Sequence, residues 1–108
     1  MVYRRSPLGL MDTTRILQDV RQVAENVLGN YDVDVYLFGS WANGTQRRTS
    51  DIDVAIDPHR PLPPGTLSML RERFEESTIP YFVDVVDLSE VGEEFRARVH
   101  REGIRWSA

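Results

Sequence analysis

Two acidic residues near the middle of the chain have the types and spacing of a metal-binding pair. Asp51 and Asp53 lie in the segment DIDVAID, whose alternation of Ile52, Val54 and Ile56 with other residues is typical of a β-strand. Residues two apart on a strand share a face and lie about 6.6 Å apart, so both carboxylates can bind divalent cations. Paired cations at phosphoryl-transfer sites lie about 3.5–4 Å apart, which requires one bridging carboxylate. Magnesium is expected, because it prefers hard oxygen ligands and leaves room for phosphate and water.

A Gly-Ser pair, separated from Asp51 by ten residues, has the properties of a phosphate-binding turn. Gly39 and Ser40 follow the run Tyr-Leu-Phe, so we expect them just past the end of a strand, where α/β sheets bind ligands. Glycine lets a phosphate approach the backbone, and the following N–H groups and the serine hydroxyl can donate to its oxygens. Arg47 and Arg48 would add charge here, or belong to a solvated loop. The pattern predicts a magnesium-dependent site for a nucleoside triphosphate.

A third carboxylate would complete this site, and Asp84 is the candidate. It lies in the middle of the apolar segment Phe-Val-Asp-Val-Val, where an unpaired acid would be costly to bury. Its predicted role is to bind metal and to accept the proton of an attacking hydroxyl. Asp87 lies three residues further on, on the opposite face of the same strand, and is the weaker choice.

The elements that must position these residues follow from periodicity. Alternation predicts strands over 31–38, 51–57 and 81–86. Apolar residues at helical spacing predict a helix that is capped by Asp12 or Thr13 and ends at Gly29, and a second helix that ends near Ser77. Ser89 is the expected N-cap of a last helix, which Gly103 stops. We therefore predict an α/β fold, with a loose arm over 1–11 and one domain over 12–108, in which Ile104 and Trp106 fold back onto the core.

Composition restricts the classes of function. The 108 residues carry a net charge of −4, which argues against a protein that mainly holds nucleic-acid backbone. Cysteine is absent, so thiol catalysis and disulfides are excluded, and the chain suits a reducing cytoplasm. No apolar run approaches the roughly 20 residues that span a bilayer, and the start of the chain does not resemble a signal peptide. We expect a cytoplasmic protein without membrane contact.

Several other residues have simpler interpretations. Asp32 and Asp34 form a second Asp-x-Asp, but they precede the Gly-Ser turn and are expected on a solvated face. His59 and His100 have no evident metal-ligand companions and are expected on the surface. Trp41 is expected to pack on a neighbouring surface rather than to stack on a base.

The motif Gly-Ser-x10-Asp-x-Asp resembles the signature of the nucleotidyltransferase fold shared by DNA polymerase β and the aminoglycoside nucleotidyltransferases. In its short length the chain is similar to the minimal nucleotidyltransferases (MNT domains), closely over 33–86. This resemblance implies a small mixed sheet with helices mainly on one face. It also implies that Asp51, Asp53 and Asp84 hold two Mg²⁺ ions and that Gly39 and Ser40 bind the triphosphate. Relatives often carry basic residues just after the Gly-Ser pair, where this chain has Trp41 and Asn43.

The resemblance further implies a partner. MNT proteins of this size are typically antitoxins opposite a HEPN-type ribonuclease toxin, and some transfer AMP from ATP to a toxin tyrosine. The expected function is therefore protein adenylylation with ATP as substrate. Two alternatives stay open: a non-catalytic antitoxin that blocks its partner by occlusion, and a nucleotidyltransferase for small molecules such as antibiotics. The nucleotide, the acceptor and the oligomeric state are open at this point.

Overall fold

A computed structural model of the chain describes residues 10–106, which form a four-stranded mixed sheet in the order β3-β2-β1-β4. Strand β1 is antiparallel to both of its neighbours, whereas β2 and β3 are parallel. The elements are, in chain order, α1 (Leu10–Leu28), β1 (Val33–Phe38), α2 (Ser40–Asn43), β2 (Ile52–Pro58), α3 (Thr66–Glu76), β3 (Val83–Asp87), the 3₁₀ helix η1 (Leu88–Glu90), α4 (Glu93–Glu102) and β4 (Ile104–Arg105). The predicted α/β class is confirmed.

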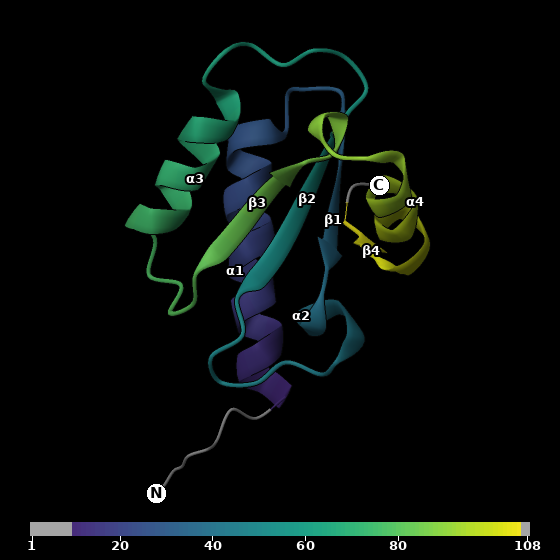
Figure 1. Cartoon of the computed structure of the whole chain (residues 1–108). Helices are drawn as coiled ribbons and strands as arrows, with labels where there is room; N and C mark the ends of the chain where they lie inside the picture. The colour runs from purple at the N-terminus through teal and green to yellow at the C-terminus, as the bar shows by residue number, and fades with distance from the viewer. Residues whose placement is uncertain (1–9, 107–108) are drawn as a thin grey trace, which may run out of the picture.

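Helices α1 and α3 cover one face of the sheet. Figure 1 shows α1 running behind the three longer strands, with α3 beside it. Val20, Ala24 and Leu28 on α1 are almost fully buried, and they belong to the same core as Ile52 and Val54 on β2. Helical spacing on α1 and alternation on β2 therefore direct both sets of side chains into one core.

Helix α4 packs on the opposite face of the sheet. Val99 on α4 and Ala55 on β2 form the centre of a smaller core, which Phe95 and Phe38 flank. The rings of Phe38 and Phe95 meet edge to face, with centroids 5.6 Å apart. Two helices on one face and one short helix on the other agree with the predicted unequal covering of the sheet.

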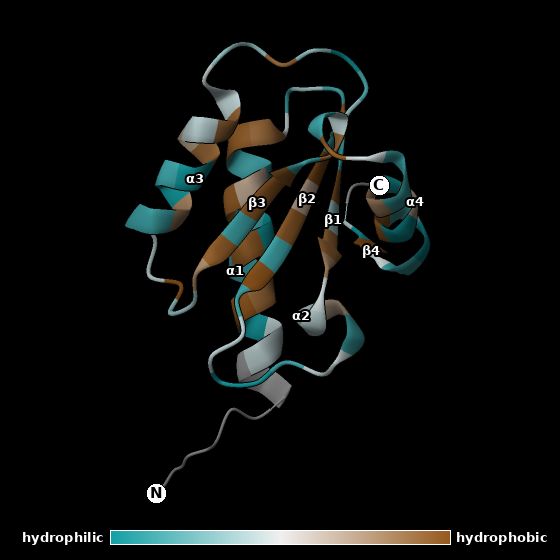
Figure 2. Ribbon diagram, in the orientation of Figure 1, coloured by the Kyte–Doolittle hydropathy of each residue, from teal (hydrophilic) through white to brown (hydrophobic). Residues whose placement is uncertain are grey.

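Hydropathy alternates along the strands in the way that a two-sided sheet requires. Figure 2 shows apolar and polar bands following one another along β2 and β3. The most apolar face carries Ile52, Val54 and Ile56, each with no exposed surface, and Asp53 and Asp57 point the other way. Within residues 10–106, no helix combines the length and the apolar character needed to cross a membrane.

Two predicted boundaries were wrong. Helix α1 begins at Leu10, before the predicted cap at Asp12 or Thr13, and the rest of the predicted arm, 1–9, lies outside the described residues. Ser89 does not cap the last helix. Its N–H and its hydroxyl both donate to Asp87 Oδ1, at 2.9 Å and 2.6 Å, which holds it in η1, and α4 starts at Glu93.

The end of the chain returns to the sheet as predicted, and Trp106 packs on the core, but the side chain of Ile104 is 46% exposed, so the prediction for Ile104 was wrong. Helix α4 stops at Gly103, and the following residues return to the sheet as β4, beside β1. The N–H of Trp106 donates to the carbonyl of Val35 at 2.7 Å, and Trp106 packs against the larger core. This return places α4 over the strand that leads into the Gly-Ser turn.

Candidate active site

The strand register places two of the predicted acids side by side. Asp53 on β2 is the register partner of Asp84 on the parallel strand β3. Just before this pair, the N–H of Ile52 donates to the carbonyl of Phe82 at 2.9 Å. Neighbouring strands lie about 4.8 Å apart, so the two carboxylates start from adjacent points on one face. Asp87 sits further along β3, where its side chain caps η1 instead.

The Gly-Ser turn lies directly against Asp53. Phe38, the last residue of β1, is the register partner of Asp53, so the chain turns at Gly39 beside this carboxylate. Gly39 has φ = 77°, a conformation that side chains rarely allow, and a Cβ at this position would overlap Asp53 Oδ2. Glycine is thus required at this position for two reasons: its backbone conformation, and the lack of room for a Cβ beside Asp53.

The pKa of Asp53 reflects both its burial and its repulsion by Asp84 and Asp51. Partial burial raises the pKa of the Asp53 carboxyl above its usual range, and the negative charges of Asp84 and Asp51 raise it further. Asp84 and Asp51 themselves are exposed. Three carboxylates that repel one another around one half-buried group form a site where a divalent cation would be stabilised.

Of the other predicted site residues, Ser40 belongs to the Gly-Ser turn, whereas Arg47 and Arg48 lie in an exposed loop. Ser40 follows Gly39 directly, as the first residue of the short helix α2. Arg47 and Arg48 are exposed in the loop between α2 and β2, and their side chains have no partner among the described residues. The backbone N–H of Arg47 donates to Ser50 Oγ at 2.8 Å, which shapes the loop. The structure therefore brings Gly39, Ser40 and the acids together and leaves both arginines in solvent.

Trp41 connects the turn, the loop and the sheet. Its ring is only 6% exposed and meets Tyr81 edge to face, with centroids 5.0 Å apart. Its indole N–H donates to the carbonyl of Ser50 at 3.3 Å, one residue before Asp51. The prediction that Trp41 packs on a protein surface is confirmed, and the residue belongs to the larger core.

A cavity of about 300 Å³ adjoins the Gly-Ser turn, between α2 and α4. Phe38, Gly39 and Asn43 form one part of its wall, and α4 supplies the rest, with Phe95, Arg98, Val99 and Glu102. Sequence reasoning missed the residues of α4, because nothing in the local pattern of this helix indicates which end of the sheet it will cover. Among the α4 residues of this wall, the sequence indicated only that Phe95 and Val99 are inward-facing apolar residues of a predicted helix.

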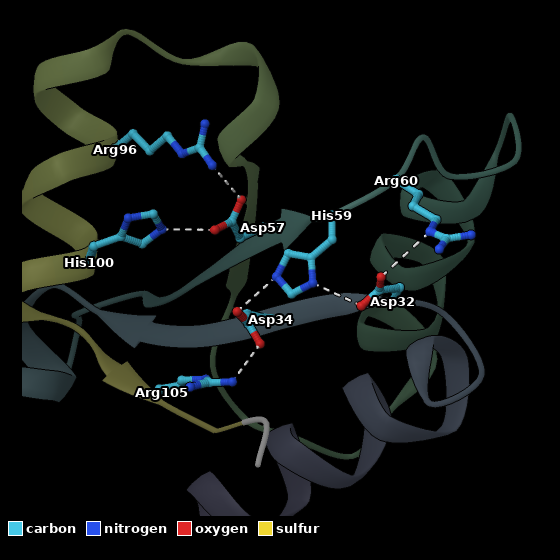
Figure 3. A network of polar contacts seen from close by, with 8 residues as sticks. All are labelled: Asp32, Asp34, Asp57, His59, Arg60, Arg96, His100 and Arg105. Atoms are coloured by element: carbon cyan, nitrogen blue, oxygen red, sulfur yellow. Dashed lines mark hydrogen bonds and ion pairs between the residues drawn. The ribbon is translucent and has the colours of Figure 1, made fainter.

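A separate group of charged side chains occupies the other end of the same sheet face (Figure 3). His59 lies between Asp32 and Asp34, with its ring nitrogens 2.8 Å and 2.9 Å from their carboxylate oxygens. These contacts raise the pKa of His59 above its ordinary value, chiefly through Asp32 and then through Asp34. Arg105 Nη2 also donates to Asp34, at 3.1 Å. The expected solvated face therefore holds only for Asp32, because the Asp34 side chain is 16% exposed and contacts both His59 and Arg105.

His100 and His59 are exposed, as predicted, but His100, like His59, contacts an acid. Its Nε2 lies 2.8 Å from Oδ2 of Asp57, and Arg96 Nη2 donates to Oδ1 of Asp57 at 3.2 Å. Asp57 is buried, so this pair of contacts compensates its charge and ties α4 to β2. The alternation in DIDVAID places Asp57 on the face opposite Ile52, Val54 and Ile56, but it cannot show what covers that face.

The acceptor atoms of Asp34, Asp57 and His59 lie within 4.8 Å of one another, close enough to suggest a metal site. We interpret them instead as part of an ion-pair network, because each of the two acids already contacts histidine or arginine. Asp57 is four residues beyond Asp53 on β2, about 13 Å along the strand. This network and the cluster of Asp51, Asp53 and Asp84 are therefore different places on one face.

The chain is similar to known nucleotidyltransferases. Residues 22–105 match the family model described as polymerase beta, nucleotidyltransferase. The "Probable protein adenylyltransferase MntA" of Haemophilus influenzae is 36% identical over 70 residues, which cover 65% of this chain and 61% of that protein. A spectinomycin 9-adenylyltransferase of Staphylococcus aureus is 35% identical over 79 residues, with 65% and 30% covered. The chain thus spans less than two thirds of the length of these relatives.

Solved structures show the same fold. A crystal structure of a toxin–antitoxin with AMP-PNP contains a chain that is 27% identical, with a TM-score of 0.64, covering 82% of this chain and 73% of that one. A second similar chain comes from a complex of a tri-AMPylated Shewanella oneidensis HEPN toxin with an MNT antitoxin. It is 19% identical, with a TM-score of 0.64, and covers 89% of this chain and 73% of that one.

Proposed function

The chain belongs to the polymerase β nucleotidyltransferase family, and from this premise we propose that it transfers AMP from ATP to a hydroxyl of a partner protein. The expected partner is a HEPN-type ribonuclease toxin, which the chain silences as its antitoxin. The observation that carries this proposal is the convergence of Asp51, Asp53 and Asp84 beside Gly39. Likeness to an MntA protein adenylyltransferase and to chains from toxin–antitoxin complexes supports the choice of acceptor.

The three acids are suited to hold magnesium. Their carboxylate oxygens are hard ligands, and the raised pKa of Asp53 reflects negative charge that a cation would neutralise. Asp51, Asp53 and Asp84 would hold two Mg²⁺ ions. Bound magnesium would supply positive charge to the phosphates of ATP. We assign to Asp84 the further role of accepting the proton as the acceptor hydroxyl attacks the α-phosphorus and pyrophosphate leaves.

The Gly-Ser turn would hold the triphosphate. Gly39 has no side chain to keep a phosphate from the backbone, and the Ser40 hydroxyl follows it immediately. Arg47 and Arg48 are exposed and unpartnered within the described residues, so they are available to a phosphate that reaches the loop. Their contribution would be the weakest, because ordering two exposed side chains costs conformational entropy. ATP as substrate and magnesium as cofactor suit the cytoplasm, where we expect this protein.

An intact-mass experiment tests the proposal. The chain is co-expressed with a HEPN-type ribonuclease, and the purified pair is incubated with ATP and Mg²⁺. We expect AMP adducts on the ribonuclease, none with Asp53→Asn or Asp84→Asn, and unchanged adducts with Asp87→Asn, which keeps a side-chain oxygen able to cap η1. Equal adduct formation by wild type and Asp53→Asn would contradict the assigned site, and no adduct from any variant would contradict the activity.

The alternatives make different predictions in the same assay. A non-catalytic antitoxin would still bind and silence the ribonuclease as the Asp53→Asn variant, without any adduct. A small-molecule nucleotidyltransferase is favoured only by the likeness to a spectinomycin 9-adenylyltransferase, of which the match covers 30%. Adenylylated spectinomycin in a reaction without the ribonuclease would support that second activity.

A further inference from the structure

The cavity between α2 and α4 adjoins the proposed active site at Gly39. Gly39 contributes to its wall and also contacts the carboxylate of Asp53. Phe38, another wall residue, is the register partner of Asp53, so its side chain lies on the same face of the sheet as the acids. A ligand that occupies this cavity would therefore have its other end beside Gly39 and the three acids.

The lining of the cavity combines aromatic rings with charged side chains, the cationic Arg98 and the anionic Glu102. Phe38 and Phe95 present their rings at 84° to each other, and the guanidinium carbon of Arg98 lies 5.6 Å from the centroid of Phe95. Aromatic rings and guanidinium planes are the groups on which nucleobases stack. Asn43, exposed at the end of α2, adds an amide with one acceptor and two donor hydrogens, a pattern that complements the polar edge of a base.

The size of the cavity also suits a nucleoside. Its volume of about 300 Å³ is at the lower end of the range for small-molecule sites. The larger cavity of about 580 Å³ lies at the other end of the sheet, beside His59 and the start of α3, and so does not adjoin Gly39. Of these two hollows, only the smaller shares a wall with the phosphate-binding turn.

We propose that the cavity between α2 and α4 binds the base of the nucleoside triphosphate, stacked against Phe95 and Arg98. This inference rests on the proposed function, which requires a nucleotide but does not say where its base lies. It also assigns a role to α4 that is separate from the chemistry of the acids. Helix α4 would recognise the nucleotide, while β2 and β3 would carry out the transfer.

The test compares two ligands that differ in having a base. Isothermal titration calorimetry measures the affinities of Mg²⁺-ATP and of Mg²⁺-tripolyphosphate, which has no ribose or base. We expect wild type to bind ATP at least about tenfold more tightly than tripolyphosphate, because stacking of one base contributes on that order. Phe95→Leu and Arg98→Ala should each weaken ATP binding severalfold and leave tripolyphosphate binding unchanged.

Matched controls separate stacking from charge and from folding. Arg73→Ala removes the same charge from an exposed position on α3, at a residue that does not line the cavity, and should change neither affinity. Arg98 is exposed, so its replacement tests the site even if Phe95→Leu fails to fold. Tripolyphosphate affinity serves as the check that each variant keeps an intact turn.

The outcomes distinguish the two proposals. If wild type binds tripolyphosphate but ATP no more tightly, or if neither Phe95→Leu nor Arg98→Ala selectively weakens ATP, the base binds elsewhere and the proposed function stands. If wild type binds neither ligand in the presence of Mg²⁺, the proposed function fails, and this inference fails with it.

Discussion

At the candidate site, the backbone conformation of Gly39 and the charge of Asp53 are set by the residues that surround them. Gly39 has a positive φ, and the Asp53 carboxylate occupies the space that a Cβ at this position would need. Asp53 in turn is half-buried and faces two other acids, so its charged form is disfavoured until a cation binds. Both residues are placed for a ligand at some cost to the stability of the free protein, as is common at functional sites.

We expect Gly39→Ala to abolish magnesium binding and to destabilise the fold. The backbone of Gly39, with φ = 77° and ψ = −157°, lies in a region that is essentially restricted to glycine, which costs a residue with a Cβ about 1–3 kcal/mol, and the overlap with Asp53 adds to it. Gly44→Ala is the comparison, because Gly44 also has a positive φ (76°), in the left-handed helical region, but no atom lies within 4 Å of the added Cβ. Thermal unfolding and calorimetry with Mg²⁺ would measure both. Equal losses in the two variants would contradict a special contact at Gly39.

Asp53→Asn should stabilise the metal-free protein at neutral pH. The folded pKa of Asp53 is raised, so wild type loses stability as the pH rises through that pKa, and the asparagine variant does not. Below about pH 3.9, the usual value of an unfolded aspartate, the difference should vanish. Melting temperatures from pH 3 to 8 would show this, with the exposed Asp19→Asn as control. Added Mg²⁺ should reverse the order by stabilising wild type only.

At the scale of elements, the site is held by connections between segments that are distant in sequence. The bond from Ile52 to Phe82 sets the register of β2 and β3, and Trp41 joins α2 to the end of the loop. Because Trp41 contacts Ser50, the loop is anchored immediately before Asp51. The loop's two arginines are exposed, so its order depends on this anchor and on the turn at Ser50.

Trp41→Phe should loosen the loop while it preserves most of the core. The phenyl ring can still pack against Tyr81, but the bond to Ser50 is lost, which costs roughly 1 kcal/mol. Trp41→Ala should cost about 3–5 kcal/mol, because it also leaves a cavity. Denaturant unfolding would give both values. Limited proteolysis at Arg47 and Arg48 should accelerate in Trp41→Phe, and an unchanged cleavage rate would contradict the anchoring role.

At the scale of the whole molecule, one face of the sheet is divided into two functional zones. The end near Gly39 carries acids that repel one another, and the other end carries acids that histidine and arginine compensate. Helix α4 spans the boundary, since Val99 packs on the sheet and His100 contacts Asp57. Figure 3 shows the compensated zone, in which Arg96 and His100 approach Asp57 from the helix.

Asp57→Ala should destabilise the protein and weaken the attachment of α4. The replacement removes the partner of both Arg96 and His100, and losses of this kind cost about 1–3 kcal/mol. His100→Gln is the comparison, because an amide can still donate to Asp57 and should cost less. Hydrogen exchange of α4 amides would report the attachment. Unchanged protection in Asp57→Ala would show that apolar packing alone holds the helix.

The sequence by itself determined the local parts of this protein. Alternation predicted the three longer strands, and the Gly-Ser and Asp-x-Asp motifs predicted both the family and the residues that the structure brings together at Gly39, Asp53 and Asp84. These features depend on backbone geometry and on neighbours a few residues away, which periodicity expresses directly.

Only the tertiary structure decided the rest. It placed Trp41 in the core, gave His59 and His100 acidic partners, left Arg47 and Arg48 in solvent, and brought α4 beside the Gly-Ser turn. Each of these results depends on strand register and on helix packing between residues far apart in the chain. Such contacts are chosen by burial and charge pairing across the fold, for which a single sequence carries no local signal.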